Sequence, residues 1–216
     1  MNLVLTGLHR VLFIRKLIYH LKKCLKKIWL NVEAVIPKDT KLSDIDIWFE
    51  DESRIGQKGT LTRIWAKRGE RPRVVRQQQY INAYIFGSVC PSQNKAEAII
   101  SPYCNSDAMH EHLKQISKAT LPGRFAIVVM DQAGWHITKN IYDIQNVIPL
   151  FLPPASPELN PMEQVWKWLK DHFLSNRVFA GYEDIEKSSC DAWNIFAKSK
   201  ELFQTMCLPK WASLNV

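Results

Sequence analysis

The sequence feature that most constrains the fold is a continuous apolar run, Phe125–Met130, which ends at Asp131. An unbroken hydrophobic run of this length, without alternating polar side chains, is typical of a strand that is buried on both faces. Such strands occur in parallel or mixed sheets whose two faces are covered by helices. The run therefore predicts an α/β fold in which Asp131 lies at the carboxyl end of a central strand.

Sequence patterns elsewhere in the chain predict the other elements of this fold. Apolar residues alternate with polar ones over 45–50, two β-rich runs follow within 60–89, and helical spacing of apolar residues recurs later. In chain order, we expect strands over 45–51, 60–66, 80–89, 125–130 and 147–152, and helices over 106–120, 136–144, 160–173 and 182–206. An open sheet of this kind binds its ligands beyond the carboxyl ends of its strands.

Chain length and charge distribution divide the sequence into a short basic segment and one domain. A chain of 216 residues with 46% hydrophobic residues can bury a sizeable core, which excludes general disorder. The formal net charge is +8, and residues 1–41 contribute +7 of it through nine lysines and arginines against two acids. We therefore expect a basic N-terminal segment over 1–41 and a folded domain over 42–216.

The basic segment has the pattern of an amphipathic helix, with apolar residues at helical steps from Leu8 to Ile28 and lysines beside them. Three roles are open: a helix packed on the domain, an arm that binds nucleic acid, or a helix on a membrane surface. We do not expect it to cross a membrane, because Arg10, Arg15 and Lys16 would each cost about 3 kcal/mol at the bilayer centre. A signal peptide is not expected either, and the five widely spaced cysteines indicate reduced thiols in the cytoplasm.

Three carboxylates fall at positions where this fold gathers ligands. Asp51 continues the apolar parity of the first strand at its expected end, and Asp131 ends the buried strand. Glu163 lies in the first turn of a helix whose start is marked by Asn160 as N-cap and by Pro161. Three such carboxylates repel one another unless cations compensate, and a pair of Mg²⁺ ions can promote displacement at phosphorus. Taken singly, each acid has a structural alternative, as a turn former or a helix cap.

A cluster of cations follows the first expected strand, with Glu70 as the only acid among them. Its members are Arg63, Lys67, Arg68, Arg71, Arg73 and Arg76. Such a cluster suits contacts with phosphates that position a DNA duplex without reading its sequence. The alternative is a solvated loop of a hairpin.

Three blocks around the carboxylates resemble the catalytic blocks of DDE transposases, nearest to the insertion-sequence 630 family within the Tc/mariner superfamily. They are FEDES at 49–53, VMDQAGWH at 129–136 and LPPASPELNPMEQVW at 152–166. The third block is highly specific, whereas the first is weak alone. The resemblance runs from about Leu42 to the C-terminus.

This resemblance implies a ribonuclease H-like mixed sheet flanked by helices, here preceded by the basic N-terminal helix. It implies an enzyme that cuts transposon ends and joins them to target DNA, with Asp51, Asp131 and Glu163 as catalytic metal ligands. Two Mg²⁺ ions are the implied cofactors, and Mn²⁺ can substitute. Glu158 is also acidic, but Glu163 matches the family position. The implied partners are DNA and either a second copy or a full-length transposase, with no membrane, at the nucleoid in the bacterial cytoplasm.

The sequence also departs from the family pattern. Ala155 stands where tyrosine is usual, and Gln132 stands where asparagine or arginine is common. Family members carry N-terminal helix-turn-helix modules for which residues 1–41 are too few, so we expect a truncated chain without specific end binding. One alternative is therefore a non-catalytic remnant that binds DNA or a full-length transposase as an inhibitor. A cellular ribonuclease H-like nuclease is a further alternative, but it leaves the third block unexplained.

Overall fold

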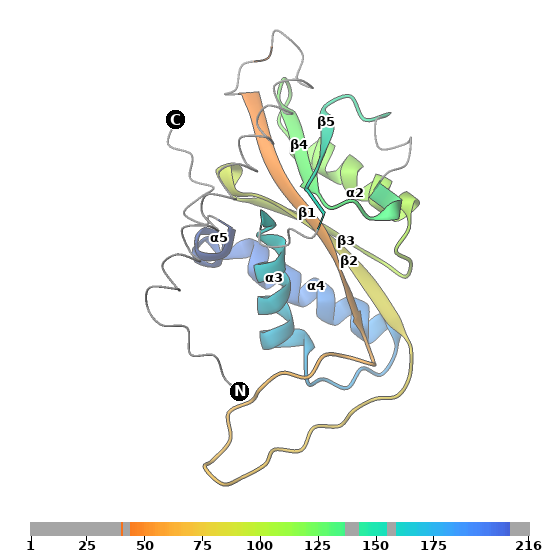
Figure 1. Ribbon diagram of the computed structural model, residues 1–216, viewed down its shortest axis with the longest axis vertical. Helices are drawn as coiled ribbons and strands as arrows, with labels where there is room; N and C mark the ends of the chain where they lie inside the picture. Colours follow the sequence, from red (N-terminus) through yellow and green to blue (C-terminus); the bar gives the residue numbers. More distant parts are fainter. Residues whose placement is uncertain (1–39, 41–43, 137–142, 155–158, 208–216) are drawn as a thin grey trace.

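The apolar run predicted to be a buried strand forms β4 (Phe125–Met130), the fourth strand across a mixed sheet. The computed structural model describes residues 40, 44–136, 143–154 and 159–207. Within this part of the chain the sheet has five strands in the order β3-β2-β1-β4-β5 (Figure 1). The expected basic helix within 1–41 lies outside the described residues, so that prediction stays open.

The sheet combines an antiparallel meander with a parallel half. β1 (Ile45–Gly56), β2 (Asn82–Cys90) and β3 (Lys95–Ser101) pair antiparallel in chain order. β1 also pairs parallel with β4, which in turn pairs parallel with β5 (Val147–Phe151). β1 is therefore the strand at which the meander meets the parallel half.

Helices cover both faces of the sheet, as expected for strands buried on two sides (Figure 1). One face packs on α2 (Ser106–Ala119). The other packs on α3 (Met162–Leu169), its π-helical extension η6 (Lys170–Leu174), α4 (Tyr182–Lys198) and α5 (Lys200–Cys207). Among the described residues, no helix combines the length and apolar character needed to cross a membrane.

Several predicted boundaries are wrong. The expected strand over 60–66 is absent from the described structure, because β1 pairs directly with β2 from Phe49↔Val89 to Gly56↔Asn82 and residues 57–81 only connect them. That pairing also carries β1 past Asp51, which lies within the strand and not at its end. The last helical region is interrupted at Ser199 and forms two helices. Of the helix expected over 136–144, residues 137–142 lie outside the described residues, and His136 ends a short 3-10 turn.

The polar alternation in β1 does not mark a solvent-facing side. Trp48 and Glu50 are both fully buried, on the face that packs against α2. Asp46 on the same face is buried as well, and its Oδ1 lies 2.6 Å from the guanidinium of Arg124. A strand sequence that reads as half-exposed is thus buried on both faces, and this brings Glu50 into the interior.

A buried histidine on α2 makes the fold sensitive to acid. His112 is fully buried, and its Nδ1 lies 3.4 Å from Gln115 Oε1 while its Nε2 has no hydrogen-bond partner in the described structure. Burial disfavours the charged ring and lowers the pKa of His112 to about 4, with the Gln115 contact opposing this change slightly. The unfolded chain takes up this proton nearer pH 6.5.

We therefore expect the contribution of His112 to stability to fall as the pH drops from about 6.5 to about 4, because only the unfolded chain binds this proton in that range. Protonation of His112 in the unfolded chain alone would lower the free energy of unfolding by about 3 kcal/mol. Replacing His112→Leu should remove that loss, measured as urea midpoints at pH 7 and pH 4.5. The exposed His172 provides the control variant His172→Leu, which should keep the wild-type acid sensitivity. Equal acid sensitivity of His112→Leu and wild type would contradict the account.

Candidate active site

The parallel pairing of β1 with β4 brings two of the predicted acids to the same level of the sheet. The last paired residues are Phe49 and Val129, and Asp51 and Asp131 each lie two positions further along their strands. Neighbouring strands lie about 4.8 Å apart. Asp51 is half-buried within β1, whereas the side chain of Asp131, just past the end of β4, is 61% exposed.

The third predicted acid is held near Asp51 by the start of α3. The Asn160 side chain donates from Nδ2 to the Glu50 carbonyl at 2.7 Å and accepts at Oδ1 from the Met162 amide at 3.1 Å. The helix starts one residue later than predicted, with Pro161 at the N-cap position, but the Asn160 side chain still binds its first amide and fastens the helix start to β1. Glu163 is exposed in the first helical turn, and its carboxylate is close enough to help raise the pKa of Asp51. Glu158 lies outside the described residues.

The surroundings of the Asp51 carboxyl group disfavour its charged form. The pKa of Asp51 is raised to about 7, chiefly by burial and further by the Glu52 and Glu163 carboxylates, while a hydrogen bond from Trp166 opposes them. A divalent cation would relieve this repulsion, since oxygen ligands of this kind suit Mg²⁺ and Mn²⁺. Asp51, Asp131 and Glu163 thus have the chemistry of a hard-metal site.

Trp166 has a second role besides packing, which the sequence did not reveal. Its indole lies in the core, as predicted from the helical stripe, and its Nε1 donates to Asp51 Oδ2 at 2.9 Å. Gly87 pairs with Asp51 across β1 and β2, and a Cβ there would come within 2.6 Å of the Trp166 ring and 2.8 Å of Trp193. The absent side chain of Gly87 therefore leaves the space in which Trp166 reaches Asp51.

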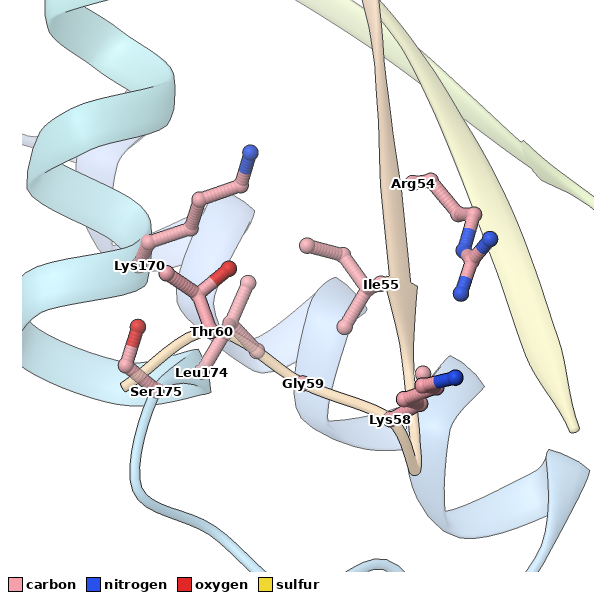
Figure 2. A pocket seen from close by; sticks show the side chains of 9 residues that line it. Arg54, Ile55, Lys58, Gly59, Thr60, Lys170, Leu174 and Ser175 are labelled. Carbon is pink, nitrogen blue, oxygen red and sulfur yellow. The ribbon is translucent and has the colours of Figure 1, made fainter. Parts of the chain in front are cut away.

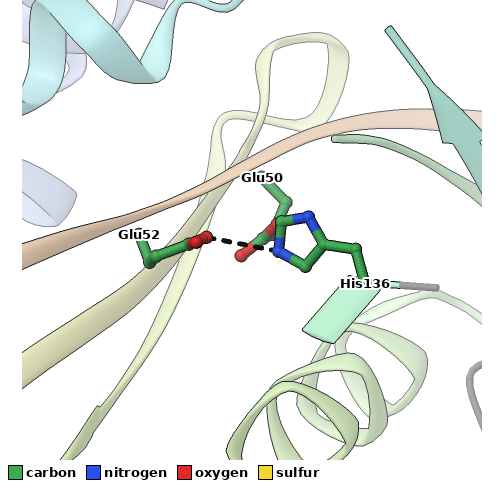
Figure 3. A group of neighbouring side chains, drawn as sticks. All are labelled: Glu50, Glu52 and His136. Carbon is green, nitrogen blue, oxygen red and sulfur yellow. Dashed lines mark ion pairs between the residues drawn. The ribbon is translucent and has the colours of Figure 1, made fainter. Parts of the chain in front are cut away.

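Sequence reasoning missed a second group of side chains on the opposite face of β1. Glu50, Glu52 and His136 point toward one another (Figure 3), and one ligand atom from each lies within 4.8 Å of the others. His136 Nε2 lies 3.3 Å from Glu52 Oε2 and 3.7 Å from Glu50 Oε2. The Trp135 indole donates to Glu52 Oε1 at 2.8 Å. The buried position of Glu50 was the missing signal, because its strand pattern suggested a solvated face.

His136 links this second group to the predicted acids. Its Nδ1 lies 2.9 Å from Asp131 Oδ1 and 3.1 Å from the Asp131 carbonyl oxygen. Burial raises the pKa of Glu50 well above its usual range, and the carboxylates of Glu52, Asp51 and Asp131 raise it further. Burial lowers the pKa of His136, but the Glu52 and Asp131 carboxylates outweigh this and raise it overall. The acids on both faces of β1 therefore form one electrostatic unit.

The predicted basic cluster lies on the connection between β1 and β2. Its six cations, Arg63, Lys67, Arg68, Arg71, Arg73 and Arg76, are all exposed. The connection is held at both ends, because Asn176 exchanges hydrogen bonds with Thr62 at 3.0 and 3.1 Å and Gln77 exchanges them with Phe179 at 2.7 and 2.9 Å. The cluster is thus displayed on a long segment with fixed ends (Figure 1).

A small pocket beside the start of this connection adds further cations. Arg54, Lys58 and Lys170 line it together with Thr60 and Ser175 (Figure 2). The side chains of Arg54 and Lys58 point away from that of Lys170, so their charges do not converge on one point. The pocket extends the basic surface but does not form a separate anion-binding site.

The bond from Trp166 to Asp51 yields a test. Trp166→Phe keeps an aromatic ring in the core but removes the donor, so the unfolding free energy should fall by about 1–2 kcal/mol. Loss of a group that orients a metal ligand typically weakens metal binding at least about tenfold, so we expect a loss of that size in Mn²⁺ affinity by titration calorimetry.

The matched control is Trp193→Phe, since the Trp193 ring packs 5.9 Å from that of Trp166 in the same core. This variant should lose stability without losing Mn²⁺ affinity. Equal Mn²⁺ affinity of Trp166→Phe and wild type would show that Trp166 only packs.

Two sequence comparisons find proteins that are similar to this chain. A sequence profile described as DDE superfamily endonuclease matches residues 46–186, which contain all three predicted acids. An uncharacterized protein of Sinorhizobium fredii, y4pE/y4sA, is 44% identical over 130 residues, which are 60% of this chain and 96% of that protein.

Solved structures of the Mos1 transposase resemble the fold. The Mos1 strand transfer complex superposes with a TM-score of 0.58 at 18% identity, covering 85% of this chain and 55% of that one. The Mos1 mariner paired end complex with Mn gives a TM-score of 0.56 at 17% identity, covering 82% and 54%. The chain thus spans about half the length of the Mos1 chains. The likeness confirms the predicted ribonuclease H-like mixed sheet flanked by helices.

Proposed function

The chain belongs to the DDE superfamily endonuclease family, and from this premise we propose that it is the catalytic domain of a transposase that cuts and joins DNA. The observation that carries the proposal is the placement of Asp51 and Asp131 at one level of two parallel strands, with Glu163 beside Asp51. The finer assignment to the insertion-sequence 630 family is part of the same proposal.

In this proposal Asp51, Asp131 and Glu163 hold two Mg²⁺ ions, for which Mn²⁺ can substitute. When bound, such ions polarise the phosphate and activate an attacking water or 3′-hydroxyl. The carboxylates supply oxygen ligands, and none of them forms a covalent bond to DNA. Trp166 orients Asp51 through its indole N–H, and Asn160 keeps Glu163 close to β1.

The proposed substrate is duplex DNA, held through its phosphates. The exposed cations of the segment between β1 and β2 support this, because lysine and arginine bind the backbone without reading sequence. A DNA substrate also fits a place of action at the nucleoid of a bacterial cell. A second copy of the chain or a full-length transposase is the proposed protein partner.

The direct test is nicking of supercoiled plasmid by the purified chain. We expect nicking in Mg²⁺ or Mn²⁺ and none in a metal chelator. Asp131→Asn should slow nicking at least about 100-fold. Loss of a residue that only hydrogen-bonds to a metal ligand typically lowers activity about 10–100-fold, and this variant changes a proposed ligand itself. The matched control is Asp107→Asn, which changes an exposed aspartate in the first turn of α2 and should nick like wild type.

The outcomes separate the proposal from its alternative. Equal cleavage by wild type and Asp131→Asn would reject the assignment of the acids. DNA binding without cleavage by wild type in either metal would favour a non-catalytic remnant that binds DNA or a full-length transposase.

A further inference from the structure

We propose that Glu50, Glu52 and His136 form a second cation site, on the α2 side of β1, which selects transition metal ions such as Zn²⁺ or Co²⁺ over Mg²⁺. Alternate residues of a strand point to opposite faces of the sheet, so Glu50 and Glu52 face away from Asp51. Asp51 accepts a hydrogen bond from Trp166 of α3, whereas Glu52 accepts one from Trp135 and lies 3.3 Å from His136 Nε2. The two sites therefore share one strand but use different ligands.

The first reason is that Glu50 is buried without a donor. Its side chain is fully buried, and neither carboxylate oxygen has a hydrogen-bond partner in the described structure. Glu52 Oε2 is also buried without a hydrogen-bond partner in the described structure. Placing unpartnered carboxylates in the interior is unfavourable unless a cation or a proton compensates. Both point at the His136 ring (Figure 3).

The second reason is the orientation of His136. The imidazole is fully buried, and its Nδ1 faces both Oδ1 and the carbonyl oxygen of Asp131, so Nδ1 carries a proton. In the neutral ring the lone pair is then on Nε2, which faces the Glu50 and Glu52 carboxylates. A histidine that donates one nitrogen to a carboxylate and offers the other to a metal is a common arrangement in metal sites.

The distances and ligand types indicate which ions fit. The three ligand atoms lie within 4.8 Å of one another. A single Zn²⁺ at about 2.1 Å from each ligand places the ligands roughly 3.4–4.2 Å apart, so the cluster need only contract slightly. One imidazole with two carboxylates suits Zn²⁺ and Co²⁺, whereas Mg²⁺ prefers oxygen ligands alone.

An ion at this site would act on the neighbouring acid. Because His136 contacts Asp131 through Nδ1, a metal on Nε2 would fix the ring and hence the orientation of Asp131. The second site would thus position an acid of the proposed catalytic centre without itself touching DNA.

Co²⁺ is a suitable probe because its visible absorption reports histidine and carboxylate coordination. We expect the full chain to bind Co²⁺ with an absorption change that excess Mg²⁺ does not reverse. His136→Asn keeps a donor at the position of Nδ1 but removes Nε2, so Co²⁺ affinity should fall at least about tenfold. Glu50→Gln should do the same. Asp51→Asn, on the opposite face, should keep the Co²⁺ spectrum.

Three results would overturn the site. Wild type that binds no Co²⁺, or His136→Asn that binds it as tightly as wild type, would mean that a proton and not a metal ion compensates the Glu50 and Glu52 carboxylates. Loss of the spectrum in Asp51→Asn but not in His136→Asn would place the ion at the other site. If circular dichroism shows Glu50→Gln to be unfolded, Glu52→Gln replaces it, since that side chain is partly exposed.

Plasmid nicking in Mg²⁺, scored on the same samples, separates this inference from the proposed function. Co²⁺ binding that survives in Asp51→Asn while nicking is lost would support both. Nicking by a wild type that binds no Co²⁺ would reject only the second site.

Discussion

The parallel pairing of β1 with β4 is the constraint on which the rest of this structure depends. It matches Phe49 with Val129, and the acids two positions beyond them come to one level of the sheet although 80 positions separate them in the chain. β4 can take this central place because its unbroken apolar sequence satisfies a strand covered on both faces. The position of the candidate site is therefore a consequence of core packing.

The second consequence is a concentration of negative charge on both faces of one strand. Asp51 faces α3, and Glu50 and Glu52 face the His136 ring on the other side of the strand. Such a cluster is costly in a folded chain, and fixed donors relieve only part of it, namely Trp166, Trp135 and the His136 ring. The proposed function would explain this cost, since a centre that binds cations needs acids that are incompletely neutralised by the protein itself.

Much of this arrangement follows from sequence, and the failures have physical causes. The runs that form β4 and β5 and the Asn105 cap of α2 are local signals, so those elements were predictable. The course of residues 57–81 was not, because β propensity does not reveal that β1 pairs directly with β2. The burial of Glu50 was also hidden, since alternation in a strand cannot tell a solvated face from one covered by a helix. His136 gained Glu50 and Glu52 as neighbours only through tertiary contacts, whereas its contacts with Asp131 are local.

The position of bound Mn²⁺, located by anomalous X-ray scattering from crystals of the protein, shows whether Asp51 and Asp131 share a metal ion. We expect an anomalous peak that contacts carboxylate oxygens of both Asp51 and Asp131, on the side of β1 from which α3 presents Glu163. Anomalous density absent from that position, with Mn²⁺ bound elsewhere on the chain, would contradict it.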